Sequence, residues 1–177
     1  GDIVVLSQAE HHANYVPWLQ LKEKLGIKLS VIPLLASGDL DLEAAKKLIA
    51  VPSVKLLALS HASNVLGIIN PVKELFAEAR TRNIITLLDA AQTIGHMPID
   101  VQDLNCDFLA ASAHKMYGPT GVGILFGRAE LLEAMPAFLG GGGMISGVYA
   151  DHFTAGLIPD KFEAGTPNIA GCIALGT

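Results

Sequence analysis

We predict an α/β fold with a mostly parallel sheet from two features of this 177-residue sequence. Short apolar runs rich in β-branched residues alternate with amphipathic stretches, which is the pattern of repeated βαβ units. Prolines and glycines also stand where helices would begin and end. Pro17 and Pro71 open two amphipathic stretches, where a first-turn proline is tolerated, and Gly26 follows the first of them at the position that favours glycine. We therefore expect a mixed, mostly parallel sheet sandwiched by helices.

The alternation gives the elements in chain order. Apolar runs predict six strands, at Ile3–Leu6, Leu29–Leu34, Lys55–Ser60, Ile84–Leu88, Phe108–Ala111 and Val122–Phe126. Amphipathic stretches between them predict four helices, at Pro17–Leu25, Leu42–Ile49, Pro71–Arg82 and Ala129–Ala134. Glycine and proline become frequent after residue 118, so we expect Gly140–Pro167 to be a long loop region that lines a site. A further helix is expected to start after Pro167.

Both ends of the sequence lead us to expect a segment of a longer protein. Gly1 and Asp2 lead straight into an apolar run without an initiator methionine. The last helix reaches Thr177 without the cap that usually ends a helix. The length itself suits one compact domain, and we find no internal repeat, so residues 1–177 are expected to belong to a single domain.

Composition excludes several classes of protein. The chain is 51% hydrophobic with a net charge of −5, which is too apolar for a disordered chain and too acidic for a nucleic-acid binder. No apolar run approaches the roughly 18 residues of a membrane helix, and no signal peptide opens the chain. Cys106 and Cys172 lie far apart and form no CxxC motif, so we expect neither disulfides nor a zinc site. We therefore expect a cytoplasmic protein without a bound metal.

Polar, titratable residues follow four of the predicted strands. In open α/β sheets, ligands bind at the carboxyl ends of the strands, so we expect the site at this edge. The four segments that follow these strands are Glu10-His11-His12-Ala13-Asn14, Ser60-His61-Ala62-Ser63-Asn64, Asp89-Ala90-Ala91-Gln92 and Ser112-Ala113-His114-Lys115.

Three other chemistries fit these residues less well. Serines stand near His61 and His114, but the G-x-S-x-G turn that exposes a nucleophilic serine is missing. The pair His11-His12 lacks the spacing of a metal site such as H-E-x-x-H. The glycine run 140–143 matches neither a P-loop nor the G-x-G-x-x-G fingerprint.

Lys115 points instead to pyridoxal phosphate. A lysine at a buried strand end is costly unless it is paired or used covalently, and this cofactor forms a Schiff base with a lysine. The cofactor also needs a carboxylate beside its pyridine nitrogen, which Asp89 can supply, and a donor toward its ring oxygen, which Gln92 can supply. His12 could stack on the ring, and the phosphate could be bound by Ser112 and His114.

With these motifs the sequence resembles the fold-type I, class V aminotransferase superfamily, and within it the group II cysteine desulfurases and selenocysteine lyases. The E-H-H-A-N-x-V-P-W segment is specific to this branch. The motifs that carry the resemblance run in order along nearly the whole chain: Glu10–Asn14 with Val16-Pro17-Trp18, His61–Gly67, Asp89–Gln92, Cys106-Asp107-Phe108, Ser112–Gly121, Gly140–Ile145 and Phe162–Asn168.

The resemblance implies a role for each matching residue in the large, pyridoxal phosphate-binding domain of such an enzyme. Lys115 would be the Schiff-base lysine and would move the proton at the substrate α-carbon. Asp89 would pair with the pyridinium nitrogen, and Gln92 would bond the ring oxygen. His12 would stack on the ring face and exchange protons with the substrate, and Asn64 would lie near the ring oxygen and the substrate carboxylate. Ser112 and His114 would bind the phosphate. Thr166 would reach the phosphate of the neighbouring subunit in a homodimer.

The implied reaction converts L-cysteine to L-alanine and leaves sulfur as a persulfide on an enzyme cysteine. The resemblance also implies that this sulfur passes to an acceptor protein for iron–sulfur cluster assembly. Selenocysteine lyase or another class V aminotransferase is the alternative enzyme, and a catalytically silent scaffold that binds the cofactor is the non-enzymatic alternative.

Several features bear on substrate detail. The sequence departs from the family pattern at Ala113, Ile68 and Gly143. The family's phosphate-binding threonine turn would precede residue 1, and its substrate-carboxylate arginine and persulfide cysteine would follow residue 177. Neither Cys106 nor Cys172 matches the catalytic cysteine, so we expect little or no desulfurase activity from these residues alone.

Overall fold

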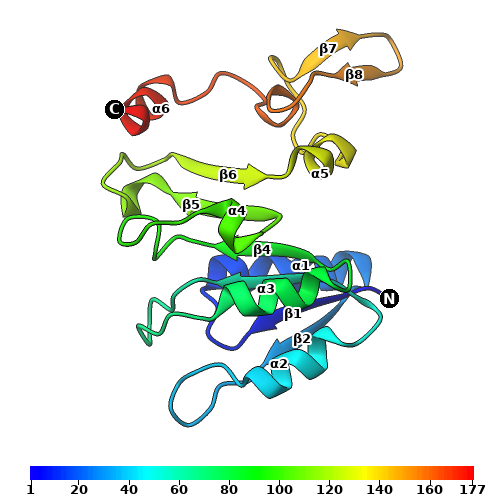
Figure 1. Cartoon of the computed structure of the whole chain (residues 1–177). Coiled ribbons are helices and arrows are strands. Elements are labelled where there is room, and N and C mark those ends of the chain that lie inside the picture. Colours follow the sequence, from blue (N-terminus) through cyan, green and yellow to red (C-terminus); the bar gives the residue numbers. More distant parts are fainter.

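A six-stranded sheet of order β2-β1-β3-β4-β5-β6 forms the centre of the computed structural model, which describes residues 1–177 (Figure 1). The strands are β1 (Ile3–Ser7), β2 (Lys28–Ile32), β3 (Val54–Ser60), β4 (Ile85–Asp89), β5 (Phe108–Ser112) and β6 (Gly123–Gly127). The first five pair in parallel, and β6 runs antiparallel to β5. The prediction of a mostly parallel sheet is therefore confirmed.

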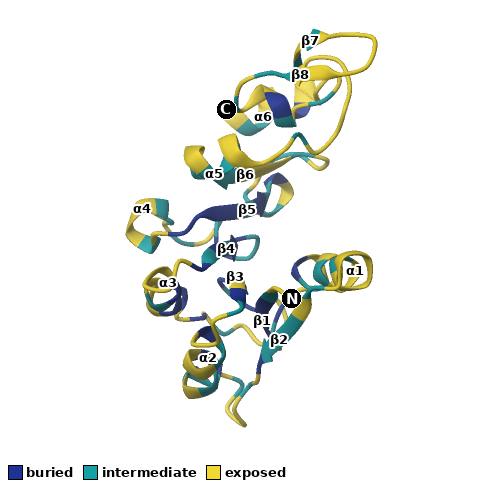
Figure 2. Ribbon diagram, turned by 90° about the vertical axis from the view of Figure 1, so that its right-hand side faces the viewer, coloured by how far each residue is buried: buried dark blue, intermediate teal, exposed yellow.

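Helices cover both faces of the sheet. Figure 2 shows α1 (Val16–Leu25) on one face and α2 (Leu42–Ile49), α3 (Val72–Arg80) and α4 (Val101–Leu104) on the other. Two more helices, α5 (Ala129–Ala134) and α6 (Ile169–Gly176), lie beyond β6, and three short 3₁₀ turns are η1 (His12–Asn14), η2 (Ala113–Lys115) and η3 (Asp160–Phe162). None of the helices combines the length and apolar character that a membrane-crossing helix needs.

Alternation along the strands separates two cores. In β1, Val5 faces the larger core, while Val4 and Leu6 face a smaller one that Trp18 of α1 also contacts. The larger core packs fully buried residues of β3 against fully buried Leu75 and Phe76 of α3. Successive strand residues point to opposite faces, so helices are needed on both sides to exclude water from the sheet.

The predicted helix ends have local causes in the structure. Gly26 adopts a left-handed conformation with φ 68° at the end of α1, where its amide donates to Lys22. Asp41 caps α2, because its Oδ1 accepts a hydrogen bond from the Ala44 amide at 2.9 Å. All six predicted strands and four predicted helices are confirmed to within two residues at each end. The helix expected after Pro167 is α6.

The prediction for Gly140–Pro167 was partly wrong. This segment contains an antiparallel hairpin, β7 (Ile145–Val148) with β8 (Phe153–Ala155), and the turn η3. The two strands have four and three residues, too few for an alternating pattern to stand out among the glycines. The four-residue helix α4 was not predicted. It begins after Asp100, whose Oδ1 accepts hydrogen bonds from the amides of Gln102 and Asp103.

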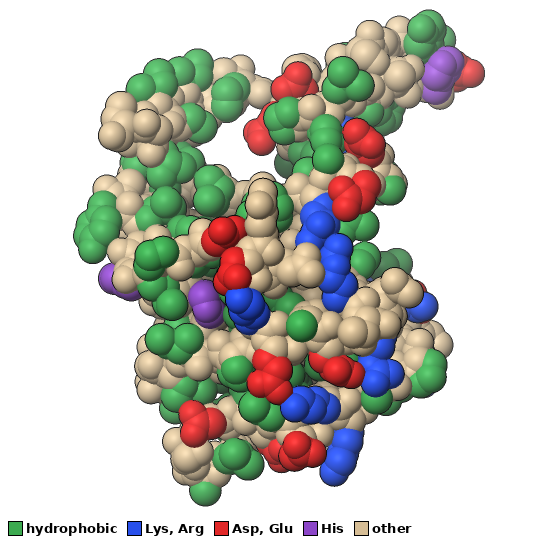
Figure 3. Space-filling view, viewed as in Figure 1, with side chains coloured by type: hydrophobic (Ala, Val, Ile, Leu, Met, Phe, Trp, Pro, Cys, Tyr) green, Lys and Arg blue, Asp and Glu red, His purple; other side chains and the backbone are tan.

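Charges of both signs are mixed on the helical surface. Figure 3 shows basic and acidic side chains interspersed over the lower part of the molecule, where α2 and α3 lie. Lys46 pairs there with Glu74 across the two helices, and Lys73 pairs with Asp103. These exposed pairs cross from one element to another, but screening by water keeps each of them weak.

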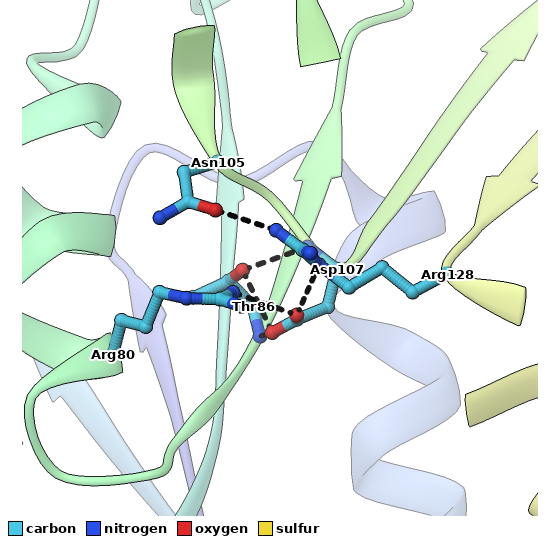
Figure 4. A network of polar contacts seen from close by, with 5 residues as sticks. All are labelled: Arg80, Thr86, Asn105, Asp107 and Arg128. Carbon is cyan, nitrogen blue, oxygen red and sulfur yellow. Dashed lines mark hydrogen bonds and ion pairs between the residues drawn. The ribbon is translucent and has the colours of Figure 1, made fainter. Parts of the chain in front are cut away.

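A buried carboxylate, Asp107, joins four elements at the amino edge of the parallel strands (Figure 4). Its Oδ2 accepts hydrogen bonds from the amide and hydroxyl of Thr86 in β4, at 2.8 and 3.2 Å. Its Oδ1 forms ion pairs with Arg80 of α3 at 3.2 Å and with Arg128, just after β6, at 2.9 Å. Arg128 also donates to Asn105. This network stabilises the sheet at the edge opposite the predicted site.

Replacing Asp107 with Asn should lower the free energy of unfolding by about 2–3 kcal/mol, because two arginines lose their charged partner. Urea denaturation measures this change. Asp103→Asn is the matched control, and loss of its exposed pair should cost less than about 1 kcal/mol. Equal unfolding midpoints for Asp107→Asn and the unaltered protein would contradict the importance of the network.

Candidate active site

The polar segments predicted to form a site meet at one edge of the sheet. Strands β1, β3, β4 and β5 are adjacent and parallel, so their carboxyl ends point the same way. They lead into η1, the loop 61–70, the turn 90–97 and η2, respectively. The prediction that four strand ends deliver their polar groups to one edge is therefore confirmed.

A cleft of about 660 Å³ opens at this edge. Four predicted site residues line it together: Asp89, Ser112, His114 and Lys115. One wall comes from η1 and the start of α1, and Leu87 of β4 and two alanines of β5 add an apolar part to the lining. The remaining lining residues are His11, Ala13, Asn14, Pro17, Trp18, Leu87, Ala91, Ala110 and Ala111. The cleft thus combines an apolar lining with a few polar groups, as small-molecule sites do.

Asp89 is the last residue of β4 and is fixed from two directions. Its Oδ1 accepts a hydrogen bond from the Ala91 amide at 2.9 Å, and its carbonyl accepts one from the His61 amide at 2.8 Å. No hydrogen bond within the chain occupies Oδ2. This half-buried carboxylate therefore keeps one oxygen for a cationic or N–H partner in the cleft.

Lys115 ends η2 and carries a half-buried amine that forms no ion pair. The backbone here is tightly held, because the amides of Met116 and Gly118 both donate to the Ala113 carbonyl at 2.9 Å. The turn after β4 packs directly on this segment. A Cβ at Gly95 would lie 2.5 Å from the Lys115 carbonyl oxygen, so only glycine allows the two backbones to approach this closely.

The other four predicted site residues do not line the cleft. His12 is exposed and lies beside His11, which does line it, with 6.0 Å between their ring centroids. Gln92 is half-buried in the turn that follows Asp89. Asn64 is exposed in the loop after β3, and Thr166 is exposed between η3 and α6.

Several residues of the predicted polar segments and motifs received no role from the sequence. Asn14 and Trp18 line the cleft and are joined by a hydrogen bond from Trp18 Nε1 to Asn14 Oδ1 at 3.3 Å, and Glu10, bonded to Asn14, is buried. His61 is also buried, and its Nδ1 lies 3.1 Å from Thr93 Oγ1 in the turn after β4. Burial lowers the pKa of the His61 imidazole.

Comparison with known proteins agrees with this geometry. The model of the family described as aminotransferase class-V matches residues 1–177. The chain belongs to the class-V aminotransferase family. A probable cysteine desulfurase from Xylella fastidiosa (strain 9a5c) is 49% identical over 99% of this chain and 42% of its own length. The chain thus spans less than half the length of the curated relatives it matches.

Solved structures extend the comparison. The cysteine desulfurase CsdA from Escherichia coli superposes with a TM-score of 0.95 at 45% identity, over 99% of this chain and 44% of that one. A C-DES mutant with glycine covalently linked to its PLP cofactor superposes with a TM-score of 0.85 at 26% identity, over 99% and 48%.

Class-V aminotransferases use pyridoxal phosphate, and the residues of the cleft fit this group. Lys115 offers an amine without a charged partner, and Asp89 offers a free carboxylate oxygen within the same cleft. Ser112 and His114 add potential donors for a phosphate. An amine, a carboxylate and anion donors in one small cleft form the set of groups that this cofactor requires.

Replacing His61 with Gln should flatten the pH dependence of stability in weak acid. Burial lowers the pKa of His61, so below about pH 6.5 the unfolded chain binds a proton that the folded chain does not. Stability contributed by neutral His61 is therefore complete above about pH 6.5 and is lost as the pH falls, by at most about 1.4 kcal/mol per pH unit.

Urea unfolding at a series of pH values between about 5 and 7 measures this slope. His96→Gln, at an exposed position, is the control. Identical slopes for His61→Gln and the unaltered protein would show that burial of His61 has no effect on the pH dependence.

Proposed function

We propose that the protein is a pyridoxal phosphate-dependent cysteine desulfurase, which converts L-cysteine to L-alanine. The observation that carries this proposal is the cleft that Lys115 and Asp89 share, in a chain 45–49% identical to proteins described as cysteine desulfurases. Within that enzyme, residues 1–177 would supply the cofactor-binding part of the large domain. Sulfur from the substrate would pass as a persulfide to an enzyme cysteine outside these residues, and then to an acceptor for iron–sulfur cluster assembly.

Lys115 and Asp89 would carry the chemistry. The bound cofactor supplies an electron sink that stabilises a negative charge at the substrate α-carbon. The Lys115 amine would hold the cofactor aldehyde covalently and, once released by substrate, would move the proton at the α-carbon. Asp89 Oδ2, which has no hydrogen bond within the chain, would keep the pyridine nitrogen protonated by accepting its N–H.

The remaining predicted residues would hold the cofactor in place. We assign Ser112 and His114 to the binding of its phosphate. Gln92 and Asn64 would bind its ring oxygen, and Asn64 would also lie near the substrate carboxylate. The second histidine of the pair, His12, would stack on the ring face and exchange protons with substrate. Asn64 and His12 are exposed and do not line the cleft, so these two assignments rest on the resemblance to the family.

Neither cysteine of the chain suits the persulfide step. Cys106 is buried, and burial raises the pKa of its thiol, which keeps it protonated and unreactive near neutral pH. Cys172 lies in α6 among residues that do not line the cleft. Both are free thiols, which agrees with a reducing cytoplasm.

A homodimer is part of the proposal. Large apolar side chains are exposed in the loop after β3 and just after η2, with Val65 81%, Ile69 62% and Tyr117 90% exposed. Exposed apolar groups of this size are common on surfaces that bind another protein. Thr166, which is exposed and does not line the cleft of its own chain, would reach the phosphate in the neighbouring subunit.

Borohydride reduction of the full-length protein with pyridoxal phosphate should attach the cofactor permanently to Lys115. Peptide mapping by mass spectrometry locates the label, and Lys115→Ala should lose it together with alanine release from cysteine. Lys73→Ala, at an exposed position, should keep both. A label on a different lysine, or none at all, would refute the assignment and favour a silent scaffold. Selenocysteine as sole productive substrate would favour a selenocysteine lyase.

Asp89→Asn should lower kcat for alanine formation by about two to three orders of magnitude with a much smaller change in KM. The lost carboxylate acts mainly on charge that develops during α-proton removal. Steady-state kinetics with L-cysteine separates the two parameters. Turnover equal to that of the Asp103→Asn control would rule out this role for Asp89.

A further inference from the structure

Glu10 is a buried carboxylate without a cationic partner. The residue is 9% exposed and lies between the end of β1 and η1. Four hydrogen bonds satisfy it instead of an ion pair: Oε1 accepts from Ser7 Oγ at 2.5 Å, and Oε2 accepts from Asn14 Nδ2 at 2.7 Å and from the amide and hydroxyl of Ser60 at 2.8 and 2.6 Å. Burial raises the pKa of Glu10, and these four donors oppose that rise.

These donors come from three separate elements. Ser7 ends β1, Ser60 ends β3, and Asn14 ends η1. Ser7, Ser60 and Asn14 are themselves buried, so the network is closed to bulk water. Glu10 therefore ties η1 to the carboxyl end of a neighbouring strand that lies fifty residues away in the sequence.

The network continues from Glu10 to the wall of the cleft. Asn14 links Glu10 to Trp18, because its Nδ2 donates to Glu10 while its Oδ1 accepts from Trp18 Nε1. Asn14, Trp18 and His11 all line the cleft. The backbone of the short turn adds a further tie, since the Asn14 amide donates to the His11 carbonyl at 2.9 Å.

The geometry favours a side chain with one oxygen that accepts from several elements at once. Glu10 Oε2 accepts from Asn14 Nδ2 and from both Ser60 donors, while Oε1 meets only the Ser7 hydroxyl. A hydroxyl can also accept, so a glutamine with its NH₂ group toward Ser7 would keep all four contacts. An alanine would leave the Ser60 amide and Asn14 Nδ2 without their acceptor.

We propose that Glu10 is a positioning residue, which fixes the His11–Asn14 turn against the end of β3 and so holds the cleft wall beside the cofactor. This proposal rests on the proposed function for the identity of the ligand, but the position of the wall can be measured without it. Glu10 acts through Asn14 and the turn, and it does not itself line the cleft.

Glu10→Ala in the full-length protein tests the proposal, with Glu10→Gln as the conservative variant. Loss of the network should raise the Kd for pyridoxal phosphate by about ten- to a hundredfold, the range found when groups that orient a site are removed. It should also change the visible circular dichroism of the bound cofactor, while borohydride still labels Lys115. Glu10→Gln, which can keep all four contacts, should retain most of the affinity.

Asp107→Asn is the matched control, because it removes a buried carboxylate network at the opposite edge of the sheet. It should destabilise the protein without changing Kd or the dichroism. A cofactor Kd and spectrum unchanged in Glu10→Ala would overturn the proposal. An equal rise of Kd in Asp107→Asn would overturn it too, since the effect would then follow stability and not the position of the wall.

Hydrogen exchange of the protein without cofactor separates this proposal from the proposed function. Amides of residues 11–18 should exchange faster in Glu10→Ala, while those of residues 101–112 should not change. Faster local exchange in a protein that binds no pyridoxal phosphate would support the positioning role and refute the proposed function. Unchanged exchange in residues 11–18 would overturn the positioning role, whatever the cofactor affinity.

Discussion

Parallel hydrogen bonding among β1, β3, β4 and β5 is the constraint on which the cleft depends. It sets the carboxyl ends of these strands at one edge and fixes their levels, so that Ser60 lies opposite Asp89 and Asp89 lies opposite Ala110. Asp89 shares a face with Leu87, and both line the cleft. A slip of one residue in β4 would turn the carboxylate to the other face of the sheet, where α3 packs. The register of β4 therefore decides whether Asp89 faces the cleft.

Much of the fold follows from local patterns. The predicted bounds of the helix Leu42–Ile49 agree with those of α2, because its amphipathic pattern continues over two turns. In the structure Asp41 caps its first turn. What could not be predicted depends on pairing at a distance. Nothing within Gly123–Gly127 distinguishes an antiparallel strand from a parallel one, since only its contact with β5 decides the direction. The β7–β8 hairpin contains Gly147 and a register shift, which hide its alternation.

The candidate site shows the same division. Asp89 and Lys115 were recognisable because each stands directly at or just after a strand end, a position that sequence can locate. Which of the two adjacent histidines lines the cleft could not be inferred, since His11 is the extended residue that caps the 3₁₀ turn and His12 is the first residue within it. The environment of Glu10 was equally hidden, because it is created by Ser60, fifty residues away.

The contact between Gly95 and the carbonyl of Lys115 has a consequence for motion. The turn that follows the acid-bearing strand and the turn that carries the amine touch backbone to backbone, with no side chain between them to compress or rotate. Displacement of one turn must therefore carry the other along. The opposite wall is attached through hydrogen bonds of the Glu10 side chain, which has rotatable bonds that packed peptide groups lack. The half of the pocket that carries Asp89 and Lys115 is therefore the stiff half.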